Sequence, residues 1–227
     1  MNNAKIENLY DLNETIAKDI FSDLTYPWEV LPKIKDFILE LGPKLNKDEY
    51  DEIEENVWVA KNAKIYPNSY LGAPCIIGKE AEVRPGAFIR GSAIVGEGAV
   101  VGNSTELKNV ILFNKVQVPH YNYVGDSILG YKAHMGAGSI TSNVKSDKAL
   151  VVIKDSLSEN PSTIETGIKK IGAMLGDNVE VGCNTVLNPG TILGREVSVY
   201  PTSCVRGVIP AGYIFKDKDN IVKREEL

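Results

Sequence analysis

The 227-residue sequence has few of the residues that bind metals or form disulfides, with only three cysteines and two histidines. An odd number of cysteines argues against a disulfide framework, and small buried thiols are expected at Cys75, Cys183 and Cys204. Structural zinc sites use paired cysteines, and no CxxC motif occurs. No metal is therefore expected in a functional site.

Long apolar runs are also absent. No stretch approaches the roughly 20 apolar residues that span a bilayer. Residues 1–24 lack the basic start and the apolar centre of a signal peptide. We therefore expect a cytoplasmic protein that is not embedded in a membrane.

Charge is unevenly distributed along the chain. Residues 1–56 contain 14 acidic and 6 basic side chains, a net charge of −8, whereas the other 16 acidic and 19 basic side chains give +3. No dense stripe of lysine and arginine with interleaved aromatic residues occurs, so a nucleic-acid partner is not expected. The mildly basic body suits a small anionic ligand instead.

One regular feature dominates the sequence: a large apolar residue at every sixth position, usually with a small residue two positions earlier. Neither the 3.6-residue period of a helix nor the alternation of an ordinary strand produces this pattern. It is the hexapeptide repeat of a parallel β-helix. The first series is Val59, Ile65, Leu71, Ile77, Val83, Ile89, Val95, Val101, Leu107 and Phe113, and the second is Leu175, Val181, Leu187, Leu193, Val199 and Val205.

Between the two series the repeat continues if two steps have five residues, from Phe113 to Val118 and from Val124 to Leu129. Three six-residue faces make one triangular coil, and the coils stack at the normal strand spacing of about 4.8 Å. Each coil buries its inward residues only against its neighbours. We therefore expect an all-β solenoid, a parallel β-helix of hexapeptide repeats, over residues 57–209.

The remaining segments depart from the repeat. Residues 1–56 are expected to be helical, mainly over 14–24 and 28–41, and to cap the open edge of the first coil or to contact a partner. Residues 144–170 are expected to leave the prism as a surface loop, either functional or dispensable. Residues 210–227 are expected to fold over the last coil.

Polar side chains gather on one flank of the expected prism. Arg90 and Lys108 occupy the same position in adjacent coils, about one strand spacing apart. Like charges at this separation repel each other, and an anion between them would relieve the repulsion. The alternative is that the two side chains splay apart into solvent. Tyr123 and Asn143 lie beside this column, and His120 lies at the corner that leads into it.

These residues resemble a known family. The segments IRGS, GNSTELK, VPHYNYVGDS and GAGSITSN are similar to the acetyltransferase domain of the bifunctional glucosamine-1-phosphate acetyltransferase/N-acetylglucosamine-1-phosphate uridyltransferase enzymes and of archaeal sugar-1-phosphate nucleotidyltransferases. The resemblance implies a left-handed coil, a homotrimer with active sites between neighbouring prisms, and acetyl-CoA as acyl donor. The implied acceptor is an amino-sugar phosphate such as glucosamine-1-phosphate, or a nucleotide-linked amino sugar. The Gly-rich signature of the uridyltransferase half does not occur, so pyrophosphorylase activity is not expected.

The resemblance also implies a role for individual residues. His120 would be the general base, and Asn143 a second catalytic residue. Gly136 to Gly138 form the turn at which the acyl donor would approach. Acceptor binding would fall to Arg90, Lys108, Tyr123, Lys148 and His134, and acetyl-CoA binding to Ala137, Gly138 and Cys183. His134 stands where the bacterial enzymes usually have asparagine, and Lys148 matches the family's loop lysine only after a one-residue gap.

The chemistry itself asks for few groups. Forming an amide from a thioester requires a neutral amine, and histidine, with an intrinsic pKa of about 6.5, is suited to remove the proton. Backbone N–H groups of the turn from Gly136 to Gly138 are candidates to hold the oxyanion. Two other hypotheses stay open: a non-catalytic sugar-nucleotide-binding or scaffold protein, favoured by His134 and the spacing before Lys148, and O-acylation or transfer of another acyl group.

Overall fold

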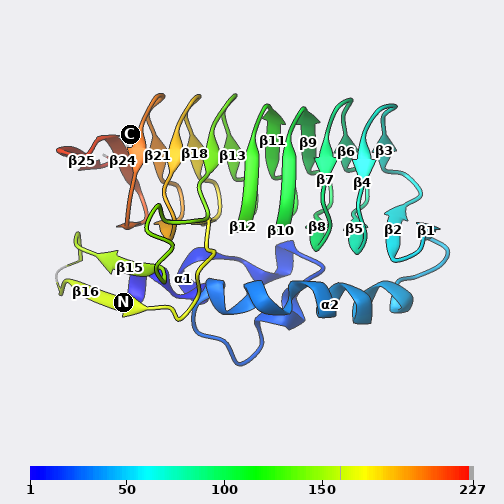
Figure 1. The fold of residues 1–227 in the computed structure, drawn as a ribbon, viewed down its shortest axis with the longest axis horizontal. Coiled ribbons are helices and arrows are strands. Elements are labelled where there is room, and N and C mark those ends of the chain that lie inside the picture. The colour runs from blue at the N-terminus through cyan, green and yellow to red at the C-terminus, as the bar shows by residue number, and fades with distance from the viewer. Residues whose placement is uncertain (159, 225–227) are drawn as a thin grey trace.

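In the computed structural model, which describes residues 1–158 and 160–224, the chain winds into a triangular prism of short parallel strands (Figure 1). The parts of the expected loop and tail at 159 and 225–227 lie outside the described residues. Successive coils pair through parallel backbone hydrogen bonds, so each coil buries its inward side chains against the next. The fold is the left-handed hexapeptide β-helix that the repeat and the resemblance predicted.

The prism has three walls, which we call face 1, face 2 and face 3 in the order in which the chain reaches them. Face 1 consists of β2 (Val57–Ala60), β5 (Cys75–Ile77), β8 (Ala93–Val95), the second halves of β10 (Glu106–Leu112) and β12 (Tyr123–Leu129), β17 (Ala173–Leu175), β20 (Thr191–Leu193) and β23 (Val208–Ile209).

Face 2 consists of β3 (Lys64–Ile65), β6 (Glu82–Val83), β9 (Val100–Asn103), β11 (Gln117–His120), β13 (His134–Met135), β18 (Glu180–Val181), β21 (Ser198–Val199) and β24 (Tyr213–Asp217). Face 3 consists of β4 (Tyr70–Leu71), β7 (Phe88–Ile89), the first halves of β10 and β12, β14 (Ile140–Thr141), β19 (Val186–Leu187) and β22 (Cys204–Val205). Antiparallel strands close both ends: β1 (Tyr50–Glu54) pairs with β2, and β25 (Asn220–Lys223) pairs with β24.

The strand register corrects one position of the predicted repeat. Val95 pairs with Leu112, so the first five-residue step runs from Leu107 to Leu112, and the assignment of Phe113 to the inward series was wrong. The second step, from Val124 to Leu129, is as predicted, because Leu112 pairs with Leu129. Phe113 is buried elsewhere, with its ring centroid 5.1 Å from that of Tyr10 in the N-terminal segment. Leu112 and Phe113 are both apolar, so either could fill the inward position of the repeat. Packing of Phe113 on the N-terminal segment leaves Leu112 as the inward residue.

Residues 2–44 of the N-terminal segment lie along face 1 (Figure 1), and only β1, at the end of this segment, covers the edge of the first coil, where helices were expected. In the structure α2 (Ile34–Leu41) packs on β8 and β10, and η4 (Pro27–Lys33) packs on β12. The reason is a row of outward side chains on face 1, all apolar and all buried: Trp58, Ile76, Ile94, Ile111, Ile128, Met174, Ile192 and Val208. Leaving this row in water would forfeit about 25 cal/mol for each Å² of apolar surface, so face 1 needs a cover.

The covering segment is only partly α-helical. Instead of one helix over 14–24 and another over 28–41, the chain forms short turns that follow the prism. Pro32 lies inside η4, so a regular helix begins only after it. The elements are η1 (Asn2–Ala4), α1 (Ile6–Leu9), η2 (Leu12–Glu14), η3 (Lys18–Phe21), η4 (Pro27–Lys33), α2 (Ile34–Leu41) and η5 (Gly42–Lys44).

Residues 144–170 leave the prism between β14 and β17 and form an antiparallel hairpin of β15 (Val152–Asp155) and β16 (Ser162–Glu165). Val151 and Ile153 are buried and belong to the same apolar core as face 1. No helix among the described residues is long and apolar enough to cross a membrane.

The buried ring of Tyr10 predicts a pH dependence of stability. Burial, with the nearby Asp177 carboxylate as a smaller cause, raises the pKa of Tyr10 well above its usual range. The unfolded chain therefore loses this proton first as pH rises, and stability falls from about pH 10 upward, by at most about 1.4 kcal/mol per pH unit for one group. We expect Tyr10→Phe to reduce this alkaline loss in urea unfolding. Tyr121→Phe, at an exposed tyrosine, is the control, and an equal effect of both variants would contradict the prediction.

Candidate functional site

The edge between face 3 and face 1, here the 3–1 edge, brings together sequence-distant polar side chains. The register pairs Ile89 with Leu107, and Leu107 with Val124. The residues that follow these positions therefore share one position in successive coils: Arg90, Lys108, Gly125, Ser142, Asn188 and Arg206. The predicted stacking of Arg90 on Lys108 is what the structure has.

The two cations do not stand unpaired, and they do not simply splay into solvent. Arg90 Nη1 donates to Glu106 Oε1 at 2.8 Å, which raises the pKa of Arg90. Lys108 Nζ contacts both carboxylate oxygens of Asp126, at 3.1 and 3.2 Å. The chain itself therefore relieves the repulsion that the sequence suggested an external anion would relieve.

Asp126 is the centre of this cluster. It is only 3% exposed and adopts a left-handed backbone conformation with φ of 48°. Besides Lys108, it accepts hydrogen bonds from Asn109 Nδ2 at 2.9 Å and Asn143 Nδ2 at 2.6 Å. A buried carboxylate with three donors is fixed in position. The repeat pattern does not indicate this role for Asp126, which lies within the segment VPHYNYVGDS.

Tyr123 and Asn143 complete the cluster. Asn143 Nδ2 lies 3.2 Å from Tyr123 Oη, so one amide links the phenol to Asp126. Burial, and secondarily the Asp126 carboxylate, raises the pKa of Tyr123, which keeps the phenol neutral. Four of the predicted residues, Arg90, Lys108, Tyr123 and Asn143, thus meet within this cluster, which we call the Asp126 cluster.

His120 lies on the edge between face 2 and face 3, here the 2–3 edge. Its backbone is held on both sides, since its N–H donates to Asn122 Oδ1 and its carbonyl accepts from Gly138 N–H. The buried Asn122 amide in turn donates to the carbonyls of Gly136 and Ser139. The imidazole itself is exposed, so a turn with a fixed backbone leaves the His120 ring accessible to a ligand.

The residues predicted to bind acetyl-CoA continue this edge. Ala137 follows His120 in the next coil, Cys183 follows Ala137, and Pro201 follows Cys183, each about one strand spacing further on. The thiol of Cys183 is exposed, which corrects the expectation that all three cysteines are buried. Cys204 is exposed as well, and Cys75 is buried with its pKa raised to about 12.

The oxyanion donors expected from the Gly136–Gly138 turn are mostly engaged. Gly136 N–H donates to the Val181 carbonyl and Gly138 N–H to the His120 carbonyl. Within the described part of the chain, only the Ala137 N–H of this turn donates to no other residue. Ala137 is therefore the donor that the turn offers to a ligand.

His134 and Lys148 are not brought to the Asp126 cluster. His134 lies on face 2, with Nδ1 2.8 Å from Glu180 Oε2. Lys148 is exposed in the segment between β14 and β15. His120 and the Asp126 cluster occupy opposite edges of face 3, separated by the Tyr123–Gly125 strand, about 10 Å of backbone. A molecule lying across face 3 would reach both.

Fold and repeats together define a hexapeptide-repeat β-helix protein. The bacterial transferase hexapeptide family (six repeats) matches residues 52–91, and the GMPPB C-terminal domain matches residues 73–171. The chain is 31% identical to the bifunctional protein GlmU of Methanococcus maripaludis, over 90% of this chain and 49% of that protein. It is 28% identical to a bifunctional sugar-1-phosphate nucleotidylyltransferase/acetyltransferase of Sulfurisphaera tokodaii, over 86% and 48%.

The chain thus spans about half the length of the curated relatives it matches. Among solved structures, an N-acyltransferase from Bacillus cereus, AntD, in complex with dTDP and coenzyme A, aligns with a TM-score of 0.41 at 16% identity, covering 78% of this chain and 91% of that one. The predicted resemblance to the acetyltransferase domains of GlmU-type enzymes is confirmed by the curated relatives.

Proposed function

We propose that this chain transfers the acetyl group of acetyl-CoA to the amine of an amino-sugar phosphate or a nucleotide-linked amino sugar. The observation that carries the proposal is the line of His120, Ala137 and Cys183 along the 2–3 edge. A donor laid along this line places its thioester beside the imidazole. The similarity to a nucleotidylyltransferase/acetyltransferase supports the same activity.

In this proposal the acceptor's ammonium group first loses one proton to solvent, and His120 takes a second proton from the amine nitrogen as that nitrogen attacks the thioester carbon. The Ala137 N–H donates to the oxyanion of the tetrahedral intermediate. The C–S bond breaks as the amide forms, and the imidazolium returns the proton to the leaving thiolate. No metal ion takes part in this scheme.

The Asp126 cluster would bind the acceptor. Arg90 and Glu106 are partly exposed, so their ion pair is worth little and an acceptor phosphate replaces Glu106 at small cost. Lys108 has three N–H donors, and its contact with Asp126 leaves at least one of them for a ligand. Asn143 and the neutral Tyr123 would then hydrogen-bond to the sugar.

The far end of the donor would lie in a cavity of about 590 Å³ at the end of the 2–3 edge. Pro201, Thr202 and Lys216 are among the residues that line this cavity.

We further propose a homotrimer in which His134 and Lys148 of one copy contact the acceptor bound to another, since neither reaches the Asp126 cluster of its own chain. Sedimentation equilibrium tests the trimer, and a monomer at working concentration would exclude it.

The proposal is tested by incubating the protein with acetyl-CoA and glucosamine-1-phosphate, galactosamine-1-phosphate, UDP-linked amino sugars or unphosphorylated glucosamine. Because Cys183 and Cys204 are exposed thiols, the acetylated sugar is measured by mass spectrometry and not by a thiol reagent alone. We expect acetylation of a phosphorylated acceptor only. Equal use of glucosamine would refute the anion-binding role of Arg90 and Lys108.

A non-catalytic sugar-nucleotide-binding protein is the second candidate. The observation that favours it is the contact of His134 Nδ1 with Glu180 Oε2 at 2.8 Å, which engages this side chain on face 2, together with the separation of Lys148 from the Asp126 cluster. Binding of a UDP-linked sugar without any acetylated product, in the same panel, would support this reading.

Substitution of Cys183 tests the donor line. We expect Cys183→Phe to raise the KM for acetyl-CoA at least tenfold, because a large ring would stand between Ala137 and Pro201 where the donor lies. Cys183→Ser, which keeps the size, should leave the KM unchanged. Initial rates at varied acetyl-CoA measure both variants, and an unaltered KM in Cys183→Phe would place the donor elsewhere.

A further inference from the structure

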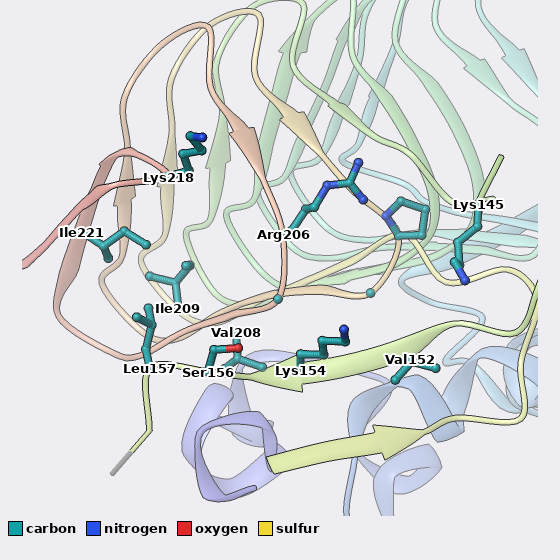
Figure 2. A pocket seen from close by; sticks show the side chains of 13 residues that line it. Lys145, Val152, Lys154, Ser156, Leu157, Arg206, Val208, Ile209, Lys218 and Ile221 are labelled. Carbon is teal, nitrogen blue, oxygen red and sulfur yellow. The ribbon is translucent and has the colours of Figure 1, made fainter. Parts of the chain in front are cut away.

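A second cavity, of about 480 Å³, lies between the hairpin strand β15 and the 3–1 edge of the last coils (Figure 2). Its volume is typical of small-molecule sites. Its walls contain four cationic side chains, Lys145, Lys154, Arg206 and Lys218, and no carboxylate residue among the described residues that line it. We call it the insertion cleft, because Lys145 and Lys154 both come from the inserted residues 144–170.

Close backbone approach builds the cleft. Gly207 has a φ of 76°, and a Cβ there would lie 2.8 Å from the Lys154 carbonyl oxygen. Gly190 has a φ of 79°, and a Cβ there would lie 2.7 Å from Val151 Cγ1. Both positions therefore need glycine for β15 to seat against the edge, so the cleft follows from the sequence and not from a loosely placed loop.

The cations of the cleft are poorly neutralised. Lys145 pairs with Asp147 at 3.2 Å, and Lys218 pairs with Asp219 at 3.8 Å, where both side chains are more than 80% exposed. For Lys154 and Arg206 no carboxylate of the described chain lies within ion-pair distance. In a chain of net charge −5, a cleft lined by four cations, three of them on one side, favours an anion.

The cleft also has an apolar end. Figure 2 shows Arg206, Lys154 and Lys145 toward one side, and Leu157, Ile209 and Ile221 toward the other. Leu157 is 44% exposed, so it has apolar surface to give to a ligand. A ligand that fits both ends carries phosphate groups and a flat or apolar portion.

We propose that the insertion cleft is a binding site for a phosphorylated small molecule of nucleotide size, separate from the site of acetyl transfer. Its phosphates lie between Lys154 and Arg206, and its base or other apolar portion packs on Leu157 and Ile221. The cleft borders the cavity proposed for the acyl donor, with which it shares Arg206, Lys218 and Ile221. Lys145 and Lys154 line only the cleft, so they distinguish the two sites.

The test is isothermal titration of the full chain with UDP and with inorganic pyrophosphate, at about 0.1 M salt so that only close charge pairs contribute. We expect saturable binding of both probes, with UDP the tighter. Lys154→Glu should weaken both at least tenfold, and Leu157→Ser should weaken UDP but not pyrophosphate. Lys169→Glu, the same charge change at an exposed lysine of the insertion outside the cleft, is the control and should change neither.

Three results would overturn the proposal: no saturable binding of either probe, equal weakening by Lys154→Glu and Lys169→Glu, or a loss of coenzyme A affinity in Lys154→Glu as large as the loss of UDP affinity. The last would assign these cations to the acyl donor. Because Lys154 is exposed, its substitution leaves the fold intact, and unchanged thermal unfolding verifies this. The readout is binding alone, so failure of acetyl transfer does not affect it.

Discussion

His120→Ala is expected to lower the kcat of acetyl transfer at least 100-fold while the protein stays folded. General-base catalysis by a positioned side chain contributes about 10² to 10⁴ in rate. The fold survives because the contacts of residue 120 with Asn122 and Gly138 use its backbone N–H and carbonyl, which alanine keeps. The measurement is steady-state kinetics at saturating acetyl-CoA with the best acceptor of the panel.

His134→Ala is the matched control, since it removes the other histidine of the chain. Its expected effect is on the KM of the acceptor, with kcat changed less than tenfold. Loss of the acid limb of the pH–kcat profile in His120→Ala alone would identify the base. Turnover near the wild-type value in His120→Ala would remove His120 from the mechanism.

Asp126→Ala is expected to destabilise the protein by about 3 kcal/mol and to raise the KM of the phosphorylated acceptor at least tenfold. Removing one partner of a buried ion pair costs about 3–5 kcal/mol, and the partial exposure of Lys108 favours the lower figure. Asn109 and Asn143 lose an acceptor at the same time. Urea unfolding measures the stability, and acceptor kinetics measure the positioning of Lys108.

Glu106→Gln offers the comparison on the same edge. Both members of the Arg90–Glu106 pair are at least one-third exposed, so its loss should cost no more than about 1 kcal/mol. It should also leave the acceptor KM equal or lower, because Glu106 no longer competes for Arg90. Equal stability losses for the two variants would show that Asp126 does not organise the cluster.

Most of the prism was predictable because its interior is narrow. Only one large and one small side chain per six residues fit inside, and a chain obeying this rule shows it directly in its sequence. The rule failed where two neighbours are both apolar: Leu112 and Phe113 each satisfy the pattern, and contacts with Tyr10 and Phe21 in the distant N-terminal segment select the first.

The sequence also contains a pattern that indicates the position of the N-terminal segment. The residue between each inward pair on face 1 is apolar, as in Ile76, Ile94 and Ile111, whereas face 2 has Glu82, Gln117 and His134 at the same position. A wall that is apolar on its outer side needs a cover. The middle residue of each repeat therefore indicates which face the segment covers.

The 18-residue length of one coil predicts the stacking of Arg90 on Lys108, but it does not predict that Glu106 and Asp126 pair with them. Asp126 sits at a corner with positive φ, and corner residues fall outside the inward pattern. Its role depends on three side chains converging from positions 108, 109 and 143, which only the folded register brings together. The insertion cleft could not be predicted from the sequence either, because it forms only when the hairpin packs against Gly190 and Gly207.

The row of buried outward side chains on face 1 limits how copies of this chain can associate. With that wall permanently occupied by residues of its own chain, only the other two walls remain for lateral contact. In a closed ring of copies that associate through those two walls, the first wall and its N-terminal segment would lie on the outer surface, away from the axis of the ring.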